Sequence, residues 1–517
     1  MKKTKKIMAL LLTAAIAVTI LGACGNSEKI NDGTANAADG TNAGAEAQED
    51  MAEISIMAMA LGPMGDGKNE VVYAINAITE KIINTHVNIT YVEVGSYAQQ
   101  LSLAITGNEK VDLCMVVPIP AGSFSTLVAQ NQLVSLNDLL PEYAPETVST
   151  VGQLIKGATV NGNIYAVPTY RDLSSKLYII ARKDLLESAD RLDAFNNMKT
   201  WTDYENIMSD VAEKNPDIVA IGNADSQGTL ITSGGCDVGA DNFSDNGIFD
   251  TLGDLYKIIK VDANGKVYDN FETDSFKNAI TRANKWYKEG LVYKDAATSK
   301  DVADTLMKSN AIFSYVNMGE TNVVAAKSAN AGSEVVVKEV AAFPVTTSAT
   351  TMFCWGVPVC SKEKEAAVKF LNLMYTNKDI MNLLAWGVEG RDYVVKDGVA
   401  NYPDGVTIQN VAYHSDEFLW GNSFISLPWS SSADAKQIAK ANFDAAPISP
   451  YLGFSCDTTK VSNELTAIQN VLSEYEPGLE SGTTNNYDEF IKALKEAGID
   501  KVITEYQTQL DAFVAAK

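Results

Sequence analysis

Ala52-Glu-Ile-Ser-Ile-Met-Ala-Met-Ala60, followed by the Gly- and Pro-containing segment 61–67, is the stretch that decides the fold. Its nearly unbroken apolar character predicts a strand that ends at the first glycine. Apolar residues then recur at spacings of four, three and four, at Val71, Ile75, Ile78 and Ile82. This periodicity predicts a helix with one apolar face.

The same alternation of strand and helix continues along the chain. Residues 87–94 alternate as a strand does, a second helix is expected over about 97–106, and residues 111–117 form an apolar run that ends at a proline. Strand, helix, strand, helix, strand is typical of an α/β fold with a parallel sheet. Ligands of such sheets bind beyond the carboxyl ends of the strands, so the loops 61–68 and 118–123 are the first expected to contact a ligand.

The chain begins with an export signal. Four lysines lie within the first six residues, the run Ile7–Leu21 is apolar and uncharged, and the small residues Gly22 and Ala23 precede Cys24. This pattern predicts a signal peptide over 1–23. Leu-Gly-Ala-Cys resembles the lipobox of bacterial lipoproteins, which implies that Cys24 is acylated, for example by palmitate, and anchors the protein to the outer face of the cytoplasmic membrane. The alternative is an ordinary signal peptide with a coincidental cysteine.

Residues 24–50 predict a flexible tether, because they contain one isoleucine and no aromatic residue. Beyond them the chain reads as a folded protein of two lobes. Apolar residues make up 46% of the chain, and no later apolar stretch is long enough to span a membrane. The net charge of −24 argues against a nucleic-acid partner.

The five further cysteines contain no Cys-x-x-Cys pair. Cys114 and Cys354 lie within apolar runs, which favours buried free thiols. A bridge between Cys354 and Cys360 is the alternative.

Several motifs together resemble the family 1 extracellular solute-binding proteins of bacterial ABC importers. Those before the C-terminal part are 131–140, 161–168, 355–359, 361–371 and 386–393. The segments 449–454, 476–482 and 497–501 are similar to the C-terminal region of a subgroup often linked to carbohydrate uptake.

The resemblance implies a two-lobed periplasmic-binding-protein-like α/β fold with hinge strands, a ligand cleft and a C-terminal helical segment. We expect lobe 1 to comprise 51–167 plus 350–395, and lobe 2 to comprise 168–349 plus 396–517. The resemblance also implies that the protein is a monomeric, surface-anchored receptor that delivers a carbohydrate to the transmembrane subunits of an ABC permease. We expect this carbohydrate to be an oligosaccharide. No cofactor or metal is expected.

A sugar offers apolar C–H faces and hydroxyl edges, so its site needs aromatic rings beside planar polar groups. Tyr170, Arg171 and Asp172, directly after the expected first crossing between lobes, supply a ring, a guanidinium and a carboxylate. The alternative is a surface turn with a local ion pair.

Further candidate ligand contacts come from three places. Tyr97 and Trp355 lie where the resemblance puts cleft residues, although each could equally be a core aromatic. Glu389 and Arg391 follow Trp386 in a Gly-x-Glu-Gly pattern, where the alternative is that they pair with each other. The loop-like segment around 420–429 contributes Trp420, Asn422 and Trp429.

Catalytic and metal motifs are weak. Ser361 and Lys364 match the Ser-x-x-Lys element of serine β-lactamases, but the other elements are out of order or missing, and Ser361 is better interpreted as a helix N-cap. Residues 262–269 hint at a calcium loop, yet their glycine is misplaced, so we expect a tight hairpin. The chain has two histidines, too few for a multi-histidine zinc site.

Two other functions compete with import. A surface glycoside hydrolase needs no more than two carboxylates, and an acidic chain always offers such pairs. A non-transport sugar-binding adhesin or sensor could use the same fold. Incubation with oligosaccharides and product analysis separates a hydrolase from a receptor.

Overall fold

The computed structural model describes residues 50–516, except 63, 224–229, 231–236, 255 and 322. The predicted signal peptide, the anchor Cys24 and the tether up to residue 49 lie outside the described residues, as does Cys236. No helix among the described residues has the length and apolar character needed to cross a membrane.

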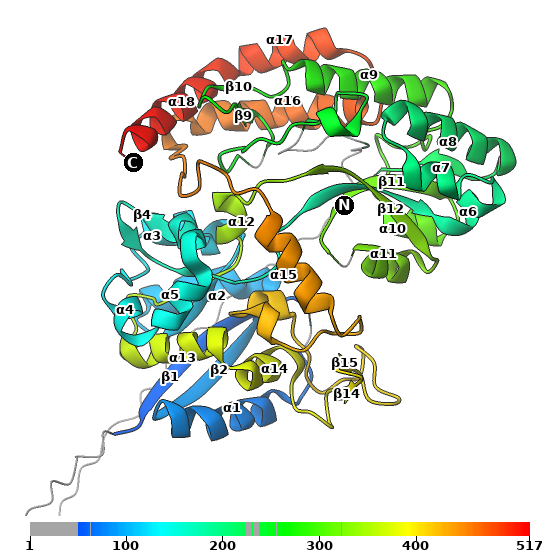
Figure 1. The fold of residues 1–517 in the computed structure, drawn as a ribbon. Helices are drawn as coiled ribbons and strands as arrows, with labels where there is room; N and C mark the ends of the chain where they lie inside the picture. The colour runs from blue at the N-terminus through cyan, green and yellow to red at the C-terminus, as the bar shows by residue number, and fades with distance from the viewer. Residues whose placement is uncertain are drawn as a thin grey trace, which may run out of the picture. The chain divides into compact units, whose positions relative to one another are not determined.

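The first sheet confirms the pattern predicted from residues 52–117. Strands β1 (Ala52–Ala60), β2 (Thr85–Glu93) and β3 (Leu113–Val116) are parallel and alternate with helices α1 (Lys68–Ile82) and α2 (Val94–Thr106). Figure 1 labels β1 and β2 side by side, next to α1. Two short strands complete the order β2-β1-β3-β13-β6: β13 (Cys354–Gly356) is antiparallel to β3, and β6 (Val167–Pro168) is antiparallel to β13.

Shorter elements surround this sheet and share its hydrophobic core. They are the helices α3 (Phe124–Ala129), α4 (Leu139–Tyr143), α5 (Pro145–Val151), α13 (Lys364–Thr376) and α14 (Lys378–Trp386), and the hairpin β4 (Thr159–Val160) with β5 (Asn163–Ile164). The hairpin β14 (Val394–Lys396) with β15 (Val399–Asn401) packs in a separate small cluster with Trp386. The short 3-10 helices nearby are η1 (Pro120–Gly122), η2 (Gly152–Ala158), η4 (Glu417–Leu419) and η5 (Ser423–Ile425).

A second sheet is built from the middle of the chain. Its order is β12-β7-β11-β8, from β7 (Lys176–Arg182), β8 (Val219–Ile221), β11 (Ile312–Gly319) and β12 (Val335–Ala342). Its helices are α6 (Lys183–Ser188), α7 (Leu192–Asn197), α8 (Trp201–Lys214), α10 (Ala303–Lys308) and α11 (Val323–Ala331), and η3 (Phe243–Asp245) follows α8.

The C-terminal helices share a core with residues 252–280, as expected for helices packed on the second lobe. They are α16 (Ser462–Glu480), α17 (Tyr487–Ala497) and α18 (Ile499–Ala515), preceded by η6 (Thr459–Val461), and they accompany α9 (Asp274–Lys288). The segment 262–269 contributes to the tight hairpin of β9 (Ile259–Val261) and β10 (Val267–Asp269), as predicted. Asp262 accepts the backbone N–H groups of Asn264 and Lys266 in its turn.

Three stretches connect the first-sheet region with the second-sheet region. The first follows β6, the second lies around α12 (Thr347–Thr351), and the third follows α15 (Ala435–Ala445). The second and third pair through a parallel bridge between Val345 and Ile448, in which Val345 N donates to Pro447 O at 2.7 Å. The chain therefore has three neighbouring crossings between its lobes.

The expected lobe boundary at residue 395 differs from the structure. Tyr413, Leu419, Trp420 and Phe443 belong to the core of the first sheet, so the segment from 396 to about 446 packs there and the chain crosses afterwards. The reason is packing: this segment lies against α13 and α14, where Asn422 N donates to Met374 O and the Tyr413 hydroxyl donates to Leu384 O. Residues after 450 belong with the second lobe.

Candidate functional site

We call residues 170–172 the hinge turn, because they begin the first crossing directly after β6. The backbone of the hinge turn is held by the segment before η5. Tyr170 N donates to Gly421 O at 2.7 Å, and Ser423 N donates to Tyr170 O at 2.9 Å. Two segments about 250 residues apart in sequence thus fix its position.

Arg171 connects the two sheets. Its Nη1 lies 3.4 Å from Glu320 Oε1, directly after β11, and donates to Asp172 O at 3.3 Å. Its Nη2 lies 3.9 Å from the sulfur of Met352 near the second crossing. The side chain is 11% exposed, and this burial lowers the pKa of Arg171 against the raising effect of Glu320 and Asp172.

Asp172 is buried and accepts several hydrogen bonds. Its Oδ1 accepts from Ser174 N at 2.8 Å and from the Ser174 hydroxyl, and its Oδ2 accepts from the Thr321 hydroxyl. Thr321 in turn accepts from Asn442 Nδ2 of α15 at 3.0 Å. The carboxylate therefore ties the first crossing to β11 and to the helix that leads into the third crossing.

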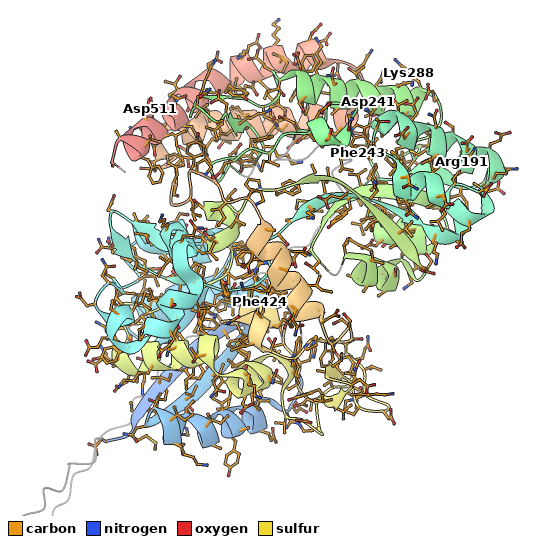
Figure 2. The ribbon with its side chains drawn as sticks, viewed as in Figure 1. Arg191, Asp241, Phe243, Lys288, Phe424 and Asp511 are labelled. Atoms are coloured by element: carbon orange, nitrogen blue, oxygen red, sulfur yellow. The ribbon has the colours of Figure 1, made fainter. Side chains whose placement is uncertain are left out.

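The ring of Tyr170 is half-buried among aromatic side chains. Phe424 and Phe443 contact it edge-on, with centroid distances of 5.3 and 5.6 Å, and Lys440 Nζ lies 5.8 Å from its centroid. Figure 2 labels Phe424 in the region of η5 beside α15. The hinge turn thus brings an aromatic ring, a guanidinium and a carboxylate together beside the crossings. That these three residues contact a ligand stays a prediction.

Trp355 and Trp420 are brought together, but in the core. Both are 0% exposed, and their rings stack at 5.2 Å with an interplanar angle of 19°. Trp355 Nε1 donates to Leu419 O and Trp420 Nε1 donates to Ser415 Oγ. Asn422 is also buried and serves the turn, since its Nδ2 donates to Tyr375 O and its Oδ1 accepts from Phe424 N.

Tyr97 lies in the core as well. It is 0% exposed, and its hydroxyl is within 3.1 Å of Met57 O and 2.6 Å of Met115 O, on neighbouring strands. The structure thus supports the core alternative for Tyr97, Trp355 and Trp420, because none of these rings offers surface to a ligand.

Trp429 differs, since it is half-buried. It stacks on Trp386 at 4.8 Å and contacts the rings of Tyr402 and His414 at 4.8 and 4.5 Å. His414 Nδ1 is buried without a hydrogen-bond partner among the described residues, and burial lowers the pKa of His414 to about 4. We call these four residues the aromatic cluster.

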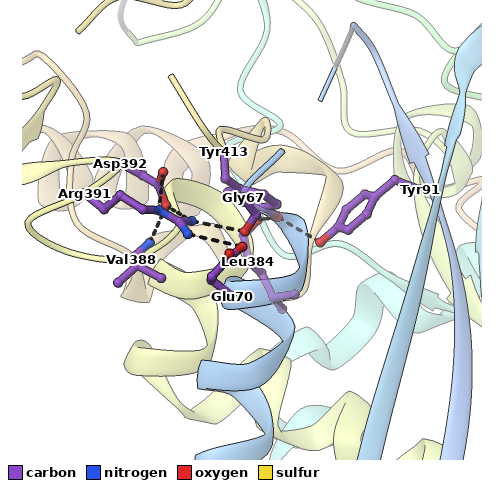
Figure 3. Close-up of polar contacts among 8 residues, drawn as sticks. All are labelled: Gly67, Glu70, Tyr91, Leu384, Val388, Arg391, Asp392 and Tyr413. Carbon is purple, nitrogen blue, oxygen red and sulfur yellow. Dashed lines mark hydrogen bonds and ion pairs between the residues drawn. The ribbon is translucent and has the colours of Figure 1, made fainter. Parts of the chain in front are cut away.

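Arg391 joins the turn after α14 to the start of α1 (Figure 3). Its guanidinium binds both carboxylate oxygens of Asp392, donates to Gly67 O at 3.1 Å and lies 3.5 Å from Glu70 Oε2. The alternative in which Glu389 pairs with Arg391 is therefore wrong. The buried Asp392, which also accepts from Val388 N at 2.8 Å, takes that place.

Glu389 instead lies exposed at the edge of a cavity of about 570 Å³ between α14 and α15. Phe424 lines the same cavity. Among the described residues, no group of three or more His, Cys, Asp and Glu side chains is placed to hold a metal ion.

The structure also tests the expected helix cap at Ser361 and the expected free cysteines. Ser361 is not a helix N-cap: α13 begins at Lys364, and the Ser361 hydroxyl donates to Asp112 Oδ1 at 2.8 Å. Cys114 and Cys354 are buried free thiols, as predicted, and Cys360 is also free, so the alternative bridge to Cys354 is absent.

The sequence did not single out Glu320, Thr321 and Phe424, which contact the hinge turn, or Asn442, which binds Thr321. They lie in a loop, on a helix and in a turn without any distinguishing motif. They lie near residues 170–172 only because the fold places the loop after β11, the turn η5 and the helix α15 beside the crossings.

Comparison with known proteins gives two family matches. Residues 73–389 match the model described as bacterial extracellular solute-binding protein, and residues 450–515 match a domain of unknown function. Among curated proteins, the chain is 26% identical over 475 residues to a carbohydrate ABC transporter substrate-binding protein of Streptococcus pneumoniae, covering 88% of this chain and 90% of the relative. It is 25% identical over 410 residues to lipoprotein LipO of Bacillus subtilis, covering 76% and 74%.

Solved structures show the same fold. The N-glycan transport solute-binding protein NgtS of Streptococcus pneumoniae matches with a TM-score of 0.76 and 23% identity, covering 90% of this chain and 99% of that one. The same protein in complex with Man5GlcNAc matches with a TM-score of 0.59 and 24% identity over the same shares. A human-milk-oligosaccharide-binding solute-binding protein of Bifidobacterium longum infantis matches with a TM-score of 0.62 and 16% identity, covering 89% and 99%.

Proposed function

Because the chain belongs to the bacterial extracellular solute-binding protein family, we propose that it is a surface receptor that binds a carbohydrate and delivers it to an ABC import permease. The names of its relatives support a sugar as the solute: one is a carbohydrate ABC transporter substrate-binding protein, and a protein of the same fold binds N-glycan fragments. An oligosaccharide is therefore the ligand class we propose.

The observation that carries the proposal is the set of contacts around the hinge turn. Arg171 and Asp172 contact Glu320 and Thr321, which follow a strand of the other sheet. Such contacts can form or break when one lobe rotates against the other about the crossings. A ligand that contacts both lobes stabilises the closed arrangement by its differential affinity for that state.

We propose that Tyr170, Arg171 and Trp429 contact the sugar. Tyr170 and Trp429 are half-buried rings, and a partly exposed ring can pack against the C–H face of a pyranose. Arg171 carries five N–H donors in a planar fork, suited to hydroxyl oxygens. Rearrangement of the contact to Glu320 would free these donors for a ligand.

We further propose that Cys24 is acylated and holds the protein on the outer face of the cytoplasmic membrane. The lipobox-like residues before Cys24 support this, as does the similarity to a protein named a lipoprotein. A monomer with a long tether suits a receptor that must reach its permease. Once its signal peptide is cleaved, the Cys24→Ala protein should move from the membrane fraction to the medium, and membrane retention of the cleaved mutant would contradict the anchor.

The protein is proposed to bind its sugar without cleaving it. Its family is one of binding proteins, and the Ser361 hydroxyl of the Ser-x-x-Lys motif donates to an Asp112 oxygen that also accepts the backbone N–H groups of Lys362 and Glu363, which is a structural role. Chromatography of an oligosaccharide after prolonged incubation should return it intact. Release of shorter products would favour the hydrolase.

The central experiment is a thermal-shift and calorimetric screen against N-glycan fragments, including Man5GlcNAc, with milk oligosaccharides and starch fragments for comparison. A ligand at a hundred times its Kd adds about 2.7 kcal/mol to the free energy of unfolding. Arg171→Ala should weaken the binding about tenfold, since a hydrogen bond to a charged group contributes about 1.5 kcal/mol.

Arg191→Ala is the matched control. Arg191 also forms an ion pair with a carboxylate, Asp210 at 2.7 Å, but on the surface of the second lobe (Figure 2). It should bind as the parent does. The proposal fails if no carbohydrate stabilises the protein.

A further inference from the structure

The cavity between α14 and α15 lies apart from the hinge turn. Its volume is about 570 Å³, within the range of about 300 to 1,000 Å³ that small-molecule sites occupy. Its walls come from α14, the turn and hairpin that follow it, the segment 424–428 and the first turn of α15. None of residues 170–172 lines it, although Phe424 contacts both the cavity and Tyr170.

The cavity has an apolar floor. Phe424 is half-buried, and the ring of Tyr393 is 5% exposed. Burial, with smaller contributions from the carboxylates of Glu389 and Asp379, raises the pKa of Tyr393 to about 12, so the phenol stays protonated and can donate. A ring floor with a phenol donor suits a ligand that presents both a C–H face and hydroxyl groups.

The rim of the cavity offers polar groups that are free to bind. Lys378, Glu389 and Gln437 are exposed lining residues, and within the described part of the chain their side chains form no hydrogen bond or ion pair. Together with the exposed carboxylate of Asp379, which also lines the cavity, they present an ammonium, two carboxylates and an amide, so donors and acceptors are both available. The hydroxyl groups of a polyol can donate to the carboxylates and accept from the ammonium and the amide, whereas an anion would meet two repulsive charges.

We propose that this α14–α15 cavity is a second carbohydrate site, which binds a single pyranose or a similar neutral polyol while the hinge-turn site is occupied. The inference rests on the proposed function, because it assumes that the protein meets sugars outside the cell. An occupant would contact the first turn of α15, the helix that carries Asn442 to Thr321 and leads into the third crossing. A small sugar bound in the cavity would therefore contact a helix that leads directly into the hinge.

The test uses methyl α-D-mannopyranoside and N-acetylglucosamine as probes in saturation-transfer NMR with the full protein, first alone and then with saturating Man5GlcNAc. We expect saturation transfer to a probe to persist when Man5GlcNAc is bound. In Ala433→Trp, which places a bulky ring at an exposed lining position, the affinity for the probe should fall at least about tenfold. Glu389→Ala should weaken it about tenfold by removing a charged acceptor.

Ser432→Trp is the matched control, since Ser432 is an exposed neighbour that does not line the cavity. It should retain the signal of the parent. Three results overturn the proposal: no transfer to either probe in the parent, complete displacement of the probe by Man5GlcNAc, or unchanged binding in Ala433→Trp. A failure of the proposed function is distinct, because then Man5GlcNAc and the other oligosaccharides leave the melting temperature unchanged whatever the probes do.

Discussion

Two stacked tryptophan pairs in the first-sheet region look alike in geometry and differ in environment. Trp355 and Trp420 stack at 5.2 Å with both rings at 0% exposure, inside the main core. Trp386 and Trp429 stack at 4.8 Å, but Trp429 keeps an exposed part and has Tyr402 and His414 as neighbours. A ring can contact a sugar only if part of its face reaches solvent, so the two pairs cannot have the same role.

The comparison shows why aromatic residues are ambiguous markers of a sugar site. The physical properties that suit a tryptophan to stack on a pyranose, a large apolar face and one N–H donor, also suit it to a core. Trp355, Trp420 and Trp386 donate their indole N–H groups to backbone or hydroxyl acceptors, as Trp386 Nε1 does to Leu427 O at 3.1 Å. Exposure, rather than residue type, distinguishes the pairs.

The largest expected effect is on the buried pair. Trp355→Ala should lower the free energy of unfolding by about 3 to 5 kcal/mol, because it leaves a cavity in the core. Chemical denaturation measures this loss, and Trp355→Phe should lose less. Carbohydrate affinity of the folded protein should stay near that of the parent. A loss of stability below about 1 kcal/mol together with weaker binding would contradict the core role.

The contribution of the aromatic cluster to the free energy of unfolding should depend on pH, whereas that of the buried pair Trp355 and Trp420 should not. The pKa of His414 is lowered from 6.5 to about 4 by burial, partly opposed by Asp392. The unfolded chain therefore binds the proton at higher pH than the folded chain, so stability is complete above about pH 6.5 and falls as the pH drops toward 4. A difference of this size in pKa corresponds to about 3 kcal/mol of unfolding free energy.

Urea denaturation between pH 7 and 4 measures this slope. His414→Phe should flatten the part of the curve that belongs to His414, whereas Trp355→Phe should lower the curve without changing its slope. An unchanged slope in His414→Phe would show that carboxylates alone set the acid sensitivity.

Trp429→Ala should show the opposite pattern to Trp355→Ala, with a small loss of stability and a large loss of carbohydrate affinity. Because the ring is half-buried, its loss should cost about 1 to 2 kcal/mol of unfolding free energy. If Trp429 contacts the sugar as proposed, affinity should fall about tenfold or more. Denaturation and calorimetry on one preparation measure both quantities, and unchanged affinity would assign Trp429 to structure.

The smallest expected effect is on the exposed Glu389. Glu389→Gln should change the free energy of unfolding by less than about 0.5 kcal/mol, because Arg391 pairs with Asp392 and Glu70 instead. Asp392→Asn should cost more, about 1 to 3 kcal/mol, since that carboxylate is buried and holds both Arg391 and Val388. Equal losses in the two variants would restore Glu389 as the partner of Arg391.

The sequence by itself determined the local elements and the fold class. The strand β1 covers the residues expected. The predicted helix also forms, with Val71 and Ile75 buried and Ile78 half-buried, although Ile82 at its end is 57% exposed. These predictions succeed because a period of two or of about 3.6 in apolar residues depends only on neighbours in the chain. The C-terminal helices were found for the same reason, and the resemblance of the motifs supplied the family.

The tertiary structure alone decided which side chains are buried and which partners they meet. Tyr97, Trp355 and Trp420 became core residues through strands and turns far away in the sequence, and segment 396–446 packed on the first sheet rather than the second. Asp112 binds Ser361 and the backbone N–H groups of Lys362 and Glu363, about 250 residues on, in place of a local helix cap. Periodicity fixes the apolar face of an element but not what covers it, because burial depends on contacts between segments that no local pattern encodes.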